Sequence, residues 1–271
     1  MAALIVNAVP NDLNRPRVFA PHWPSRVAWA GLGLYTLYAL STLNVSWTRV
    51  LAGGPQALKM LSRMWPPNMA PDKLDLIASG LLESLQIALI STFAGVLLSL
   101  PLALMAARNL SPTTLSAAAR IVIALCRSFH PIIVAILFVK AVGFGALSGV
   151  LALVVSSMGF VSKLLAEVLE ELDERQVEAV RATGAGFFQI LVMAVMPQVF
   201  ARFIGLSAYQ FDSNLRNSTM VGIVGGGGIG AALFTAYQRF DYDVVFTILL
   251  LIIALIMVSE ALSMGLKKVF R

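Results

Sequence analysis

The chain has 271 residues, of which 58% are hydrophobic and only 13% are charged, and its mean hydropathy is +0.83. Soluble domains carry about 25% charged and about 45–50% apolar residues, so a soluble globule of this composition would lack the polar groups to cover its surface. These values exclude an ordinary soluble domain and predict an integral membrane protein. The net charge of +6 is scattered over tails and loops, which indicates basic residues held on the cytoplasmic side of a membrane and not a nucleic-acid partner.

Charge-free windows predict where the chain crosses the membrane, because a crossing helix needs about 20 mainly apolar residues. The window at 117–139 is apolar except for Arg120, Arg127 and His130, and we expect it to be a span interrupted near Arg127 to Pro131. Proline and polar groups are tolerated in a span when neighbouring helices satisfy the backbone groups that they free. The predicted spans are residues 27–48, 84–107, 117–139, 141–162, 182–201 and 244–266.

The uncharged window at 217–238 is not among the predicted spans because of its glycines, which are Gly222, Gly225, Gly226, Gly227, Gly228 and Gly230. Glycine makes a helix costly to hold, and unpaired backbone groups do not face lipid. We therefore predict a re-entrant or loop segment that lines a cavity inside the protein.

The order of spans and basic residues predicts the organisation of the chain. The first 26 residues carry three arginines and no cleavage site of the kind that follows a signal peptide. Six spans place both termini on one side, and basic residues in both tails indicate the cytoplasm. The predicted parts are a cytoplasmic tail (1–26), an additional N-terminal transmembrane helix (27–48), an external loop (49–79), a transmembrane domain (80–266) and a second cytoplasmic tail (267–271).

Cysteine and histidine are too sparse for a metal centre or a disulfide framework. Cys126 is the single cysteine, and His22 and His130 lie far apart in the sequence. No HxxxH or HExxH spacing occurs, so zinc-dependent hydrolysis has no ligands. We expect Cys126 to be a small buried hydrophobic residue, and we predict neither a metal site nor a catalytic residue.

The polar segment from Lys163 to Arg181 separates two predicted spans and holds six of the fourteen acidic residues. A charge run of this kind is usually a solvated loop or helix face. Here a short amphipathic helix followed by a turn at Gly184 would also be suited to dock into a groove on a partner protein. Pro197 then falls inside the next apolar span, where it can kink the helix.

The residues Glu178-Ala179-Val180, Gly184 and Met196-Pro197 resemble the cytoplasmic signature of ABC importer permeases, which is Glu-Ala-Ala, three residues, Gly, nine residues, Ile, one residue and Leu-Pro. Val180, Ala194 and Met196 depart from it by small or apolar replacements. The resemblance implies an all-α, polytopic transmembrane bundle of the type I ABC importer permease type, with a cytoplasmic coupling helix in a segment at 170–186. It also implies two separate ATP-binding cassette subunits as partners. The residues implied in coupling to them are Glu178, Ala179, Val180, Thr183, Gly184 and Pro197.

Further runs, such as Val177 to Ala185, Phe211 to Thr219 and Val221 to Gly230, resemble the phosphonate permeases of this superfamily over roughly residues 80–266. The resemblance implies import of phosphonates or a related phosphorus oxyanion (phosphite, hypophosphite) across the bacterial inner membrane. It also implies a periplasmic or lipoprotein substrate-binding protein and a second copy of this chain. The sequence has no GxxxxGK[ST] phosphate loop, so ATP and Mg are expected on the partner ATPase, with no cofactor and no enzymatic activity in this chain.

Several polar residues are candidates for the substrate pathway. Glycine N–H groups and neighbouring polar side chains favour anions, although glycines equally permit close helix packing. Arg127 and His130 share one helical face and either line the anion path or, for Arg127, reach the lipid headgroups. The candidates are Arg127, His130, Asn214, Arg216, Asn217, Ser218, Thr219, Gly225, Gly226, Gly227 and Gly228.

Two alternatives remain open from the sequence. An ion-coupled secondary transporter would use a carboxylate within a span, for which Glu260 or Glu83 is available. An ABC permease for another small solute, such as an amino acid, would carry the same signature.

Overall fold

The computed structural model describes residues 23–43 and 46–269, and the regular elements in that part of the chain are all helices. The all-α prediction is confirmed. The chain divides into two compact units, residues 1–58 and 59–271. The first unit contains α1 (Trp23–Thr42) and the beginning of α2 (Trp47–Met64), and neither helix buries a residue.

α2 is amphipathic and falls in the region predicted as an external loop (49–79). Its apolar side chains, among them Trp47, Leu51 and Leu58, share one side of the helix and are exposed. Its charged residues are all basic and lie on the opposite side: Arg49, Lys59 and Arg63. The predicted external segment is therefore largely helical: α2 fills its first half, and the next helix already begins at Pro71.

The second unit is a helical bundle built around α6 (Ala146–Glu170), which packs against α3 (Pro71–Ala106), α4 (Thr113–Ser128), α5 (Pro131–Val142) and α9 (Met196–Ile223). Small residues make this close packing possible, as they do between helices in membranes. A side chain at Gly95 of α3 would collide with Ser157 of α6, and one at Gly159 of α6 would collide with Cys126 of α4.

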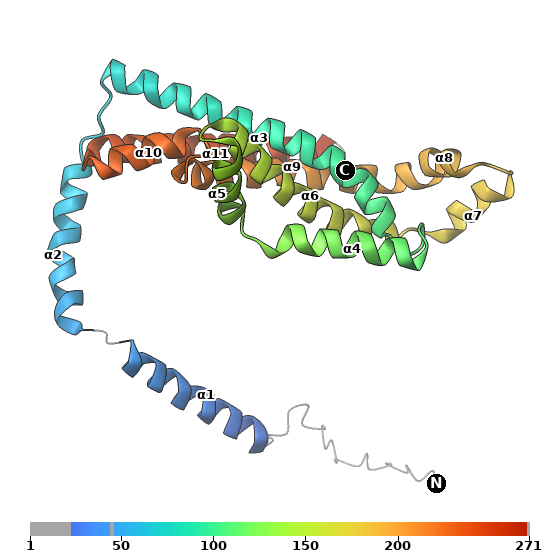
Figure 1. The fold of residues 1–271 in the computed structure, drawn as a ribbon, viewed down its shortest axis with the longest axis horizontal. Helices are drawn as coiled ribbons and strands as arrows, with labels where there is room; N and C mark the ends of the chain where they lie inside the picture. The colour runs from blue at the N-terminus through green and yellow to red at the C-terminus, as the bar shows by residue number, and fades with distance from the viewer. Residues whose placement is uncertain (1–22, 44–45, 270–271) are drawn as a thin grey trace, which may run out of the picture. The chain divides into compact units, whose positions relative to one another are not determined.

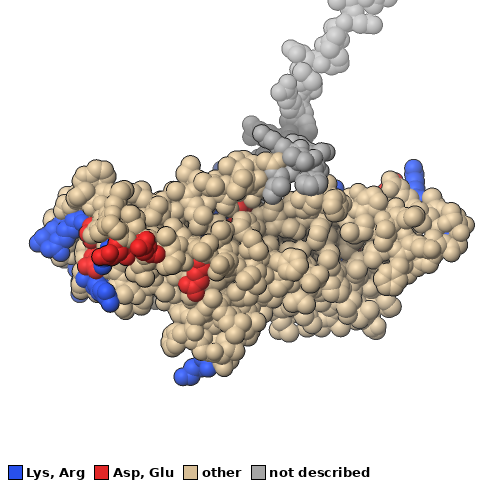
Figure 2. Space-filling model, turned by 90° about the horizontal axis from the view of Figure 1, so that it is seen from above, with Lys and Arg blue, Asp and Glu red and all other residues tan. Residues whose placement is uncertain are grey.

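The two ends of this bundle carry different elements (Figure 1). At one end, α3 ends, α4 begins and α6 ends, followed by α7 (Glu174–Ala182) and α8 (Phe187–Ile190). At the other end lie the turn between α5 and α6, a glycine turn after α9, and α10 (Ile229–Gln238), and there α11 (Tyr242–Val269) begins. In Figure 2, charged side chains gather toward one end of the face in view, and most of that face is uncharged.

Four helical stretches in the described part of the chain are long and apolar enough to cross a membrane, namely α3, α6, the run from Phe187 to Ile223, and Tyr242–Gly265 of α11. α4 and α5 together count as a fifth, with an 89° bend between them. The sixth predicted span, at residues 27–48, stays a prediction, because α1, which includes Pro24 and Arg26, is not among the helices that qualify in the described part of the chain.

The predicted interruption near Arg127 to Pro131 is confirmed by the bend between α4 and α5. Pro131 begins α5, and His130 before it is extended, with φ −66° and ψ 141°. Proline lacks an N–H and disfavours a helical conformation in the residue before it, so the helix breaks here.

The window at 217–238, predicted as a re-entrant or loop segment, is helical on both sides of a short turn, so it is not a continuous loop. α9 continues to Ile223, and α10 starts at Ile229. Only Gly225, Gly227 and Gly228 have positive φ angles, so the irregular backbone is confined to the turn between the two helices.

Candidate functional site

The segment with the permease-like signature folds as a short, exposed helix between two long ones. Asp173 caps α7 by accepting a hydrogen bond from the backbone N–H of Arg175, at 3.1 Å. After Thr183 the helix ends at Gly184, whose φ of 81° is readily available only to glycine. The short helix and its glycine stop, predicted from the sequence, are therefore present.

No residue of α7 is fully buried. Glu178, Ala179, Thr183 and Gly184 are exposed, and Val180 is half-buried. The aromatic rings of Phe187 and Phe188 follow directly and are 56% and 78% exposed. An exposed helix beside exposed aromatic rings is a surface suited to a protein partner.

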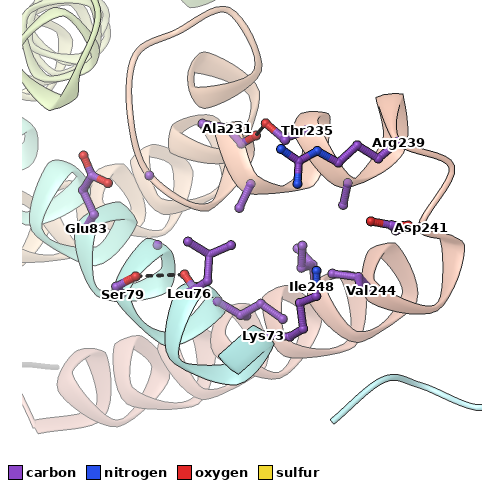
Figure 3. Close-up of a pocket in the computed structure, with 15 residues that line it drawn as sticks. Lys73, Leu76, Ser79, Glu83, Ala231, Thr235, Arg239, Asp241, Val244 and Ile248 are labelled. Atoms are coloured by element: carbon purple, nitrogen blue, oxygen red, sulfur yellow. Dashed lines mark hydrogen bonds between the residues drawn. The ribbon is translucent and has the colours of Figure 1, made fainter. Parts of the chain in front are cut away.

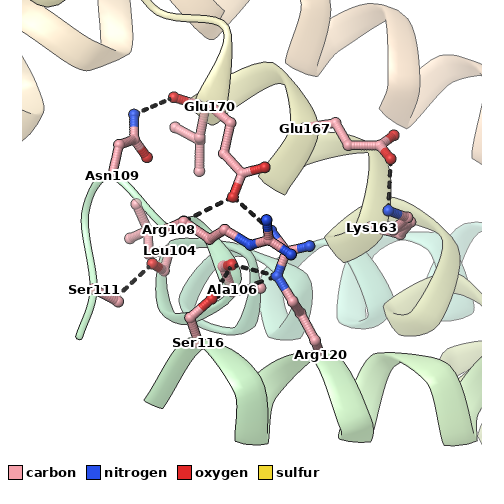
Figure 4. Close-up of polar contacts among 11 residues, drawn as sticks. Leu104, Ala106, Arg108, Asn109, Ser111, Ser116, Arg120, Lys163, Glu167 and Glu170 are labelled. Atoms are coloured by element: carbon pink, nitrogen blue, oxygen red, sulfur yellow. Dashed lines mark hydrogen bonds and ion pairs between the residues drawn. The ribbon is translucent and has the colours of Figure 1, made fainter. Parts of the chain in front are cut away.

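The residues just before α7 are tied to the start of α4 (Figure 4). The Glu170 carboxylate accepts hydrogen bonds from the backbone N–H of Arg108, at 2.8 Å, and from the Arg120 guanidinium, at 2.5 Å. The carbonyl of Leu169 accepts from the side-chain amide of Asn109, at 2.7 Å. The two bonds to the Glu170 carboxylate are charge-assisted and therefore stronger than neutral ones. Together these contacts hold the end of α6 to the α3–α4 turn.

The same residues are also tied to α9. The backbone N–H of Asp173 donates to Oε1 of Gln198 at 3.1 Å, and Arg202 pairs with Glu171 at 2.7 Å. Gln198 follows Pro197, which lies at the start of α9 within the helical run from Phe187 to Ile223 and has no N–H to donate. The distortion expected from Pro197 is present immediately before it, as a π-helical segment (η1, Leu191–Val195).

A buried hydrogen-bond network lies in the middle of the bundle. The Asn214 amide donates to Thr92 at 2.9 Å and to Ser157 at 2.8 Å, and the Gln210 amide donates to Ser157 and to Asn214 at 3.0 Å each. Asn214 is fully buried, and Ser218 is buried as well. These two candidate pathway residues therefore face the interior of the protomer.

An exposed strip runs along α9 at the same depth. Tyr209, Arg216 and Met220 are exposed and share one side of the helix. Arg216 is two residues from Asn214, which contacts Ser157 near the middle of α6, so its guanidinium starts near the middle of the bundle. Asn217 and Thr219 are half-buried beside this strip.

Arg127 and His130 come together at the bend between α4 and α5. Both line a pocket of about 320 Å³ that also includes Phe160 of α6. The Phe160 ring stacks on Tyr209 of the α9 strip, with ring centroids 5.5 Å apart. The bend and the strip are thus neighbours along one side of the bundle.

The glycine turn is closely packed. A Cβ at Gly227 would lie 2.7 Å from Oε1 of Glu83, and one at Gly225 would collide with the Phe144 ring. Side chains at Gly226 and Gly228 would likewise collide, with Val221 and Ser84. These surroundings favour the interpretation that the glycines allow elements to approach, over that of an exposed anion nest.

Sequence reasoning missed a pocket of about 410 Å³ between α3, α10 and α11 (Figure 3). Its walls are largely apolar, and its charged residues are Lys73, Glu83, Arg239 and Asp241. It also missed Asp212 of α9, which accepts a hydrogen bond from Ser259 of α11. No sequence motif marks either feature, because helices distant in the sequence bring these residues together.

No group of His, Cys, Asp and Glu in the described part of the chain is arranged to hold a metal ion.

Comparisons with known proteins agree with this architecture. The family described as binding-protein-dependent transport system inner membrane component matches residues 99–270. The phosphite transport system permease protein PtxC of Stutzerimonas stutzeri is 37% identical over 251 residues, which cover 90% of each chain. The phosphate-import permease protein PhnE of Mycolicibacterium smegmatis is 38% identical over 224 residues, or 82% of this chain, but this chain spans only 42% of that relative's length.

Solved structures share the fold. The inward-facing MetNI methionine ABC transporter is 22% identical with a TM-score of 0.66, covering 75% of this chain and all of that chain. An amino acid ABC transporter solved with histidines is 20% identical with a TM-score of 0.61, covering 72% of this chain and 94% of that one. The family match extends over well over half of the sequence and includes the end of α3 and all of α4 to α11. This chain is therefore a multi-pass membrane protein that belongs to the family of binding-protein-dependent transport system inner membrane components.

Proposed function

We propose that this chain is the membrane-spanning permease subunit of an ATP-driven importer for phosphonates or a related phosphorus oxyanion, such as phosphite or hypophosphite. The observation that carries the proposal is α7, an exposed helix with the permease signature, whose base is tied by hydrogen bonds to both α4 and α9. The class of substrate is supported by relatives named for phosphite and phosphate transport.

In this proposal α7 docks on an ATP-binding cassette subunit, and two such subunits serve two copies of the chain. Glu178, Ala179, Val180, Thr183 and Gly184 form the docking surface and its turn. ATP and Mg bind to the ATPase, and this chain performs no chemistry of its own. Closure of the ATPases moves the helices as rigid bodies.

Arg216 supports an anion as the cargo. An arginine facing lipid near the middle of a membrane costs about 2.5–3.5 kcal/mol on insertion scales, so it is expected to face a polar path or a protein partner. Arg216 is exposed on its protomer. A second copy of the chain placed over the α9 strip would enclose it, with Arg127 and His130 along the same side.

The orientation follows from the docking role. α7 faces the cytoplasm of the inner membrane, and the glycine turn and α10 face the side on which a periplasmic or lipoprotein binding protein delivers substrate. Both termini lie in the cytoplasm if α1 adds one further crossing, so the assignment of residues 27–48 as an additional transmembrane helix is part of the proposal.

An ion-coupled secondary transporter is the second candidate, and one observation favours it. Asp212 is a half-buried carboxylate within a candidate span and accepts a hydrogen bond from Ser259. Proton- and sodium-coupled carriers place carboxylates in such positions.

Reconstitution of the purified assembly distinguishes an ATP-driven importer from an ion-coupled secondary transporter. We expect the chain to copurify with an ATPase subunit, and we expect proteoliposomes to take up a labelled phosphonate or phosphite only with binding protein and ATP. Unlabelled phosphonates, phosphite and phosphate in competition rank the substrates, and an amino acid serves as the control solute. Uptake by the chain alone, driven by an ion gradient, would refute the proposal in favour of a secondary transporter.

A further inference from the structure

Four consecutive residues, Glu170, Glu171, Leu172 and Asp173, join the long helix α6 to α7, and we call them the junction. We propose that Glu170 with Arg120, and Asp173 with Gln198, are two positioning contacts through which a displacement of α7 reaches α4 and α9 together. This inference rests on the proposed function, because it describes how an ATPase moves the bundle through α7.

The first contact joins the junction to α4. The Arg120 guanidinium binds Glu170 and also donates to the carbonyl of Ala106, at 3.1 Å, in the last turn of α3. Ser116 donates to that carbonyl too, at 2.7 Å. One planar guanidinium thus fixes the ends of α3 and α6 and the first half of α4 in one arrangement.

This ion pair is more than a surface contact. The side chains of Arg120 and Glu170 retain only 30% and 28% of their exposure, and the carboxylate accepts a second hydrogen bond from the backbone N–H of Arg108. A partly buried carboxylate with two donors holds its geometry better than an exposed pair, which contributes little on average.

The second contact joins the junction to α9. Gln198 accepts from the backbone N–H of Asp173, which is the capping residue of α7, and donates to the carbonyl of Ala194 in η1, at 2.8 Å. Gln198 therefore links the capping residue of α7 to the distorted segment that precedes α9. The Arg202–Glu171 ion pair also joins the junction to α9. Its side chains are 58% and 66% exposed, so we expect it to transmit less of the displacement of α7.

Apolar packing behind the junction does not replace these contacts. Leu172 and Val177 pack against a cluster that includes Leu169, Ala119 and Val199. Apolar contacts are non-directional, so they hold the helices together without fixing the direction in which one moves another. Hydrogen bonds with fixed donors and acceptors supply that direction.

The test measures transport per ATP in the complete complex, reconstituted with its ATPase and binding protein. Glu170→Gln weakens the first contact from an ion pair to a neutral hydrogen bond, and Gln198→Leu removes the second, each with little change in volume. We expect each to lower the ratio of substrate transported to ATP hydrolysed by about 5-fold or more, the lower end of usual coupling between sites. The amount of ATPase that copurifies is expected to stay at the level of the unmodified complex.

The matched control is a second ion pair, between a lysine and a glutamate, one turn earlier on α6. Lys163 and Glu167 are 2.6 Å apart and both belong to α6, so their contact joins no two elements. We expect Glu167→Gln to leave the transport ratio unchanged. Exchanging the charges, as Arg120→Glu with Glu170→Arg, is expected to recover part of the ratio lost in either single variant.

Two results would overturn the inference, and they differ from failure of the proposed function. A wild-type ratio in Glu170→Gln and Gln198→Leu, even with less assembled complex, would mean that the contacts only stabilise the fold. An equal loss in Glu167→Gln would mean that any charge removed from this end has the same effect. Failure of the proposed function would instead appear in the unmodified chain, as transport without an ATPase.

Discussion

Single glycines show most directly how residue type determines this fold. Gly222 and Gly205 both lie within α9, but their surroundings differ. A Cβ at Gly222 would lie 2.8 Å from the Cα of Gly230 and would also collide with the carbonyl of Gly227, whereas nothing lies within 4 Å of one at Gly205. Gly222 is therefore required by the contact between α9 and α10, and Gly205 is not.

We expect Gly222→Ala to lower the thermal midpoint of the purified complex, because overpacking of a close contact costs about 1–3 kcal/mol. Gly205→Ala should leave the midpoint unchanged or raise it, since alanine is the better helix former by up to about 1 kcal/mol. Thermal unfolding in one detergent compares the two variants directly. Equal midpoints would show that the α9–α10 contact adjusts without cost.

The sequence identified the glycine-rich turn but not the reason for its glycines. Their density predicted irregular backbone, and the turn at 225–228 is irregular. The predicted segment, 217–238, was longer than this turn. Without their packing partners, Gly222 and Gly230 indicated breaks in a helix. The sequence likewise did not reveal the hydrogen bonds of Asn214, since its partners Thr92 and Ser157 are more than fifty positions away.

Elements with strong local signals were predicted well. α7 has a capping aspartate at Asp173 and a glycine stop at Gly184, and the bend between α4 and α5 has Pro131, so both follow from a few neighbouring residues. The number of spans did not follow in this way. The helix found in the first predicted span is α1, which starts at Trp23 and so includes Pro24 and Arg26, and it is not among the described helices that qualify as spans.

The amphipathic helix α2 indicates how the segment before α3 is oriented relative to the membrane. Its exposed apolar side carries Trp47, Leu51 and Leu58, while its charges are all basic. Helices with this pattern lie in the membrane interface, with the apolar side about 5–10 Å into the headgroup and acyl boundary. We therefore expect α2 to lie on the membrane surface.

Spin labels at two positions of α2 test this, in a Cys126→Ser background that removes the single native cysteine. Leu58 is 69% exposed on the apolar side, and Gln56 lies on the opposite side. In lipid bilayers a label at Leu58→Cys should be accessible to oxygen and shielded from a nickel chelate, with the reverse at Gln56→Cys. The same accessibility at both positions would contradict an interfacial helix.

At the scale of the whole molecule, local sequence patterns are least informative. The signature predicted the surface of α7, but the junction depends on Arg120 and Gln198, which come from helices on either side of it. The pocket between α3, α10 and α11 combines residues about 150 positions apart. Such arrangements follow from helix packing, which a single sequence does not reveal when most helices are similarly apolar.

The exposed strip on α9 is the feature of the protomer that most requires a partner. Arg216 lies near the middle of the bundle and is exposed. Tyr209 and Met220 are exposed on the same side of α9. Lipid does not accommodate this guanidinium cheaply, whereas a second copy of the chain would surround it with protein and water. The next residue after Met220, Val221, points into the protomer and is fully buried.

These neighbours provide a matched pair for cross-linking in the Cys126→Ser background. We expect Met220→Cys to join two copies of the chain with a short bifunctional maleimide in intact membranes, because the strip of one copy meets that of the other. Val221→Cys lies at almost the same depth but is shielded by its own protomer, so it should give no dimer. Because both positions share one depth and one helix, cross-linking at neither would mean that the strip faces something other than a second copy, and the enclosure of Arg216 would then require a different partner.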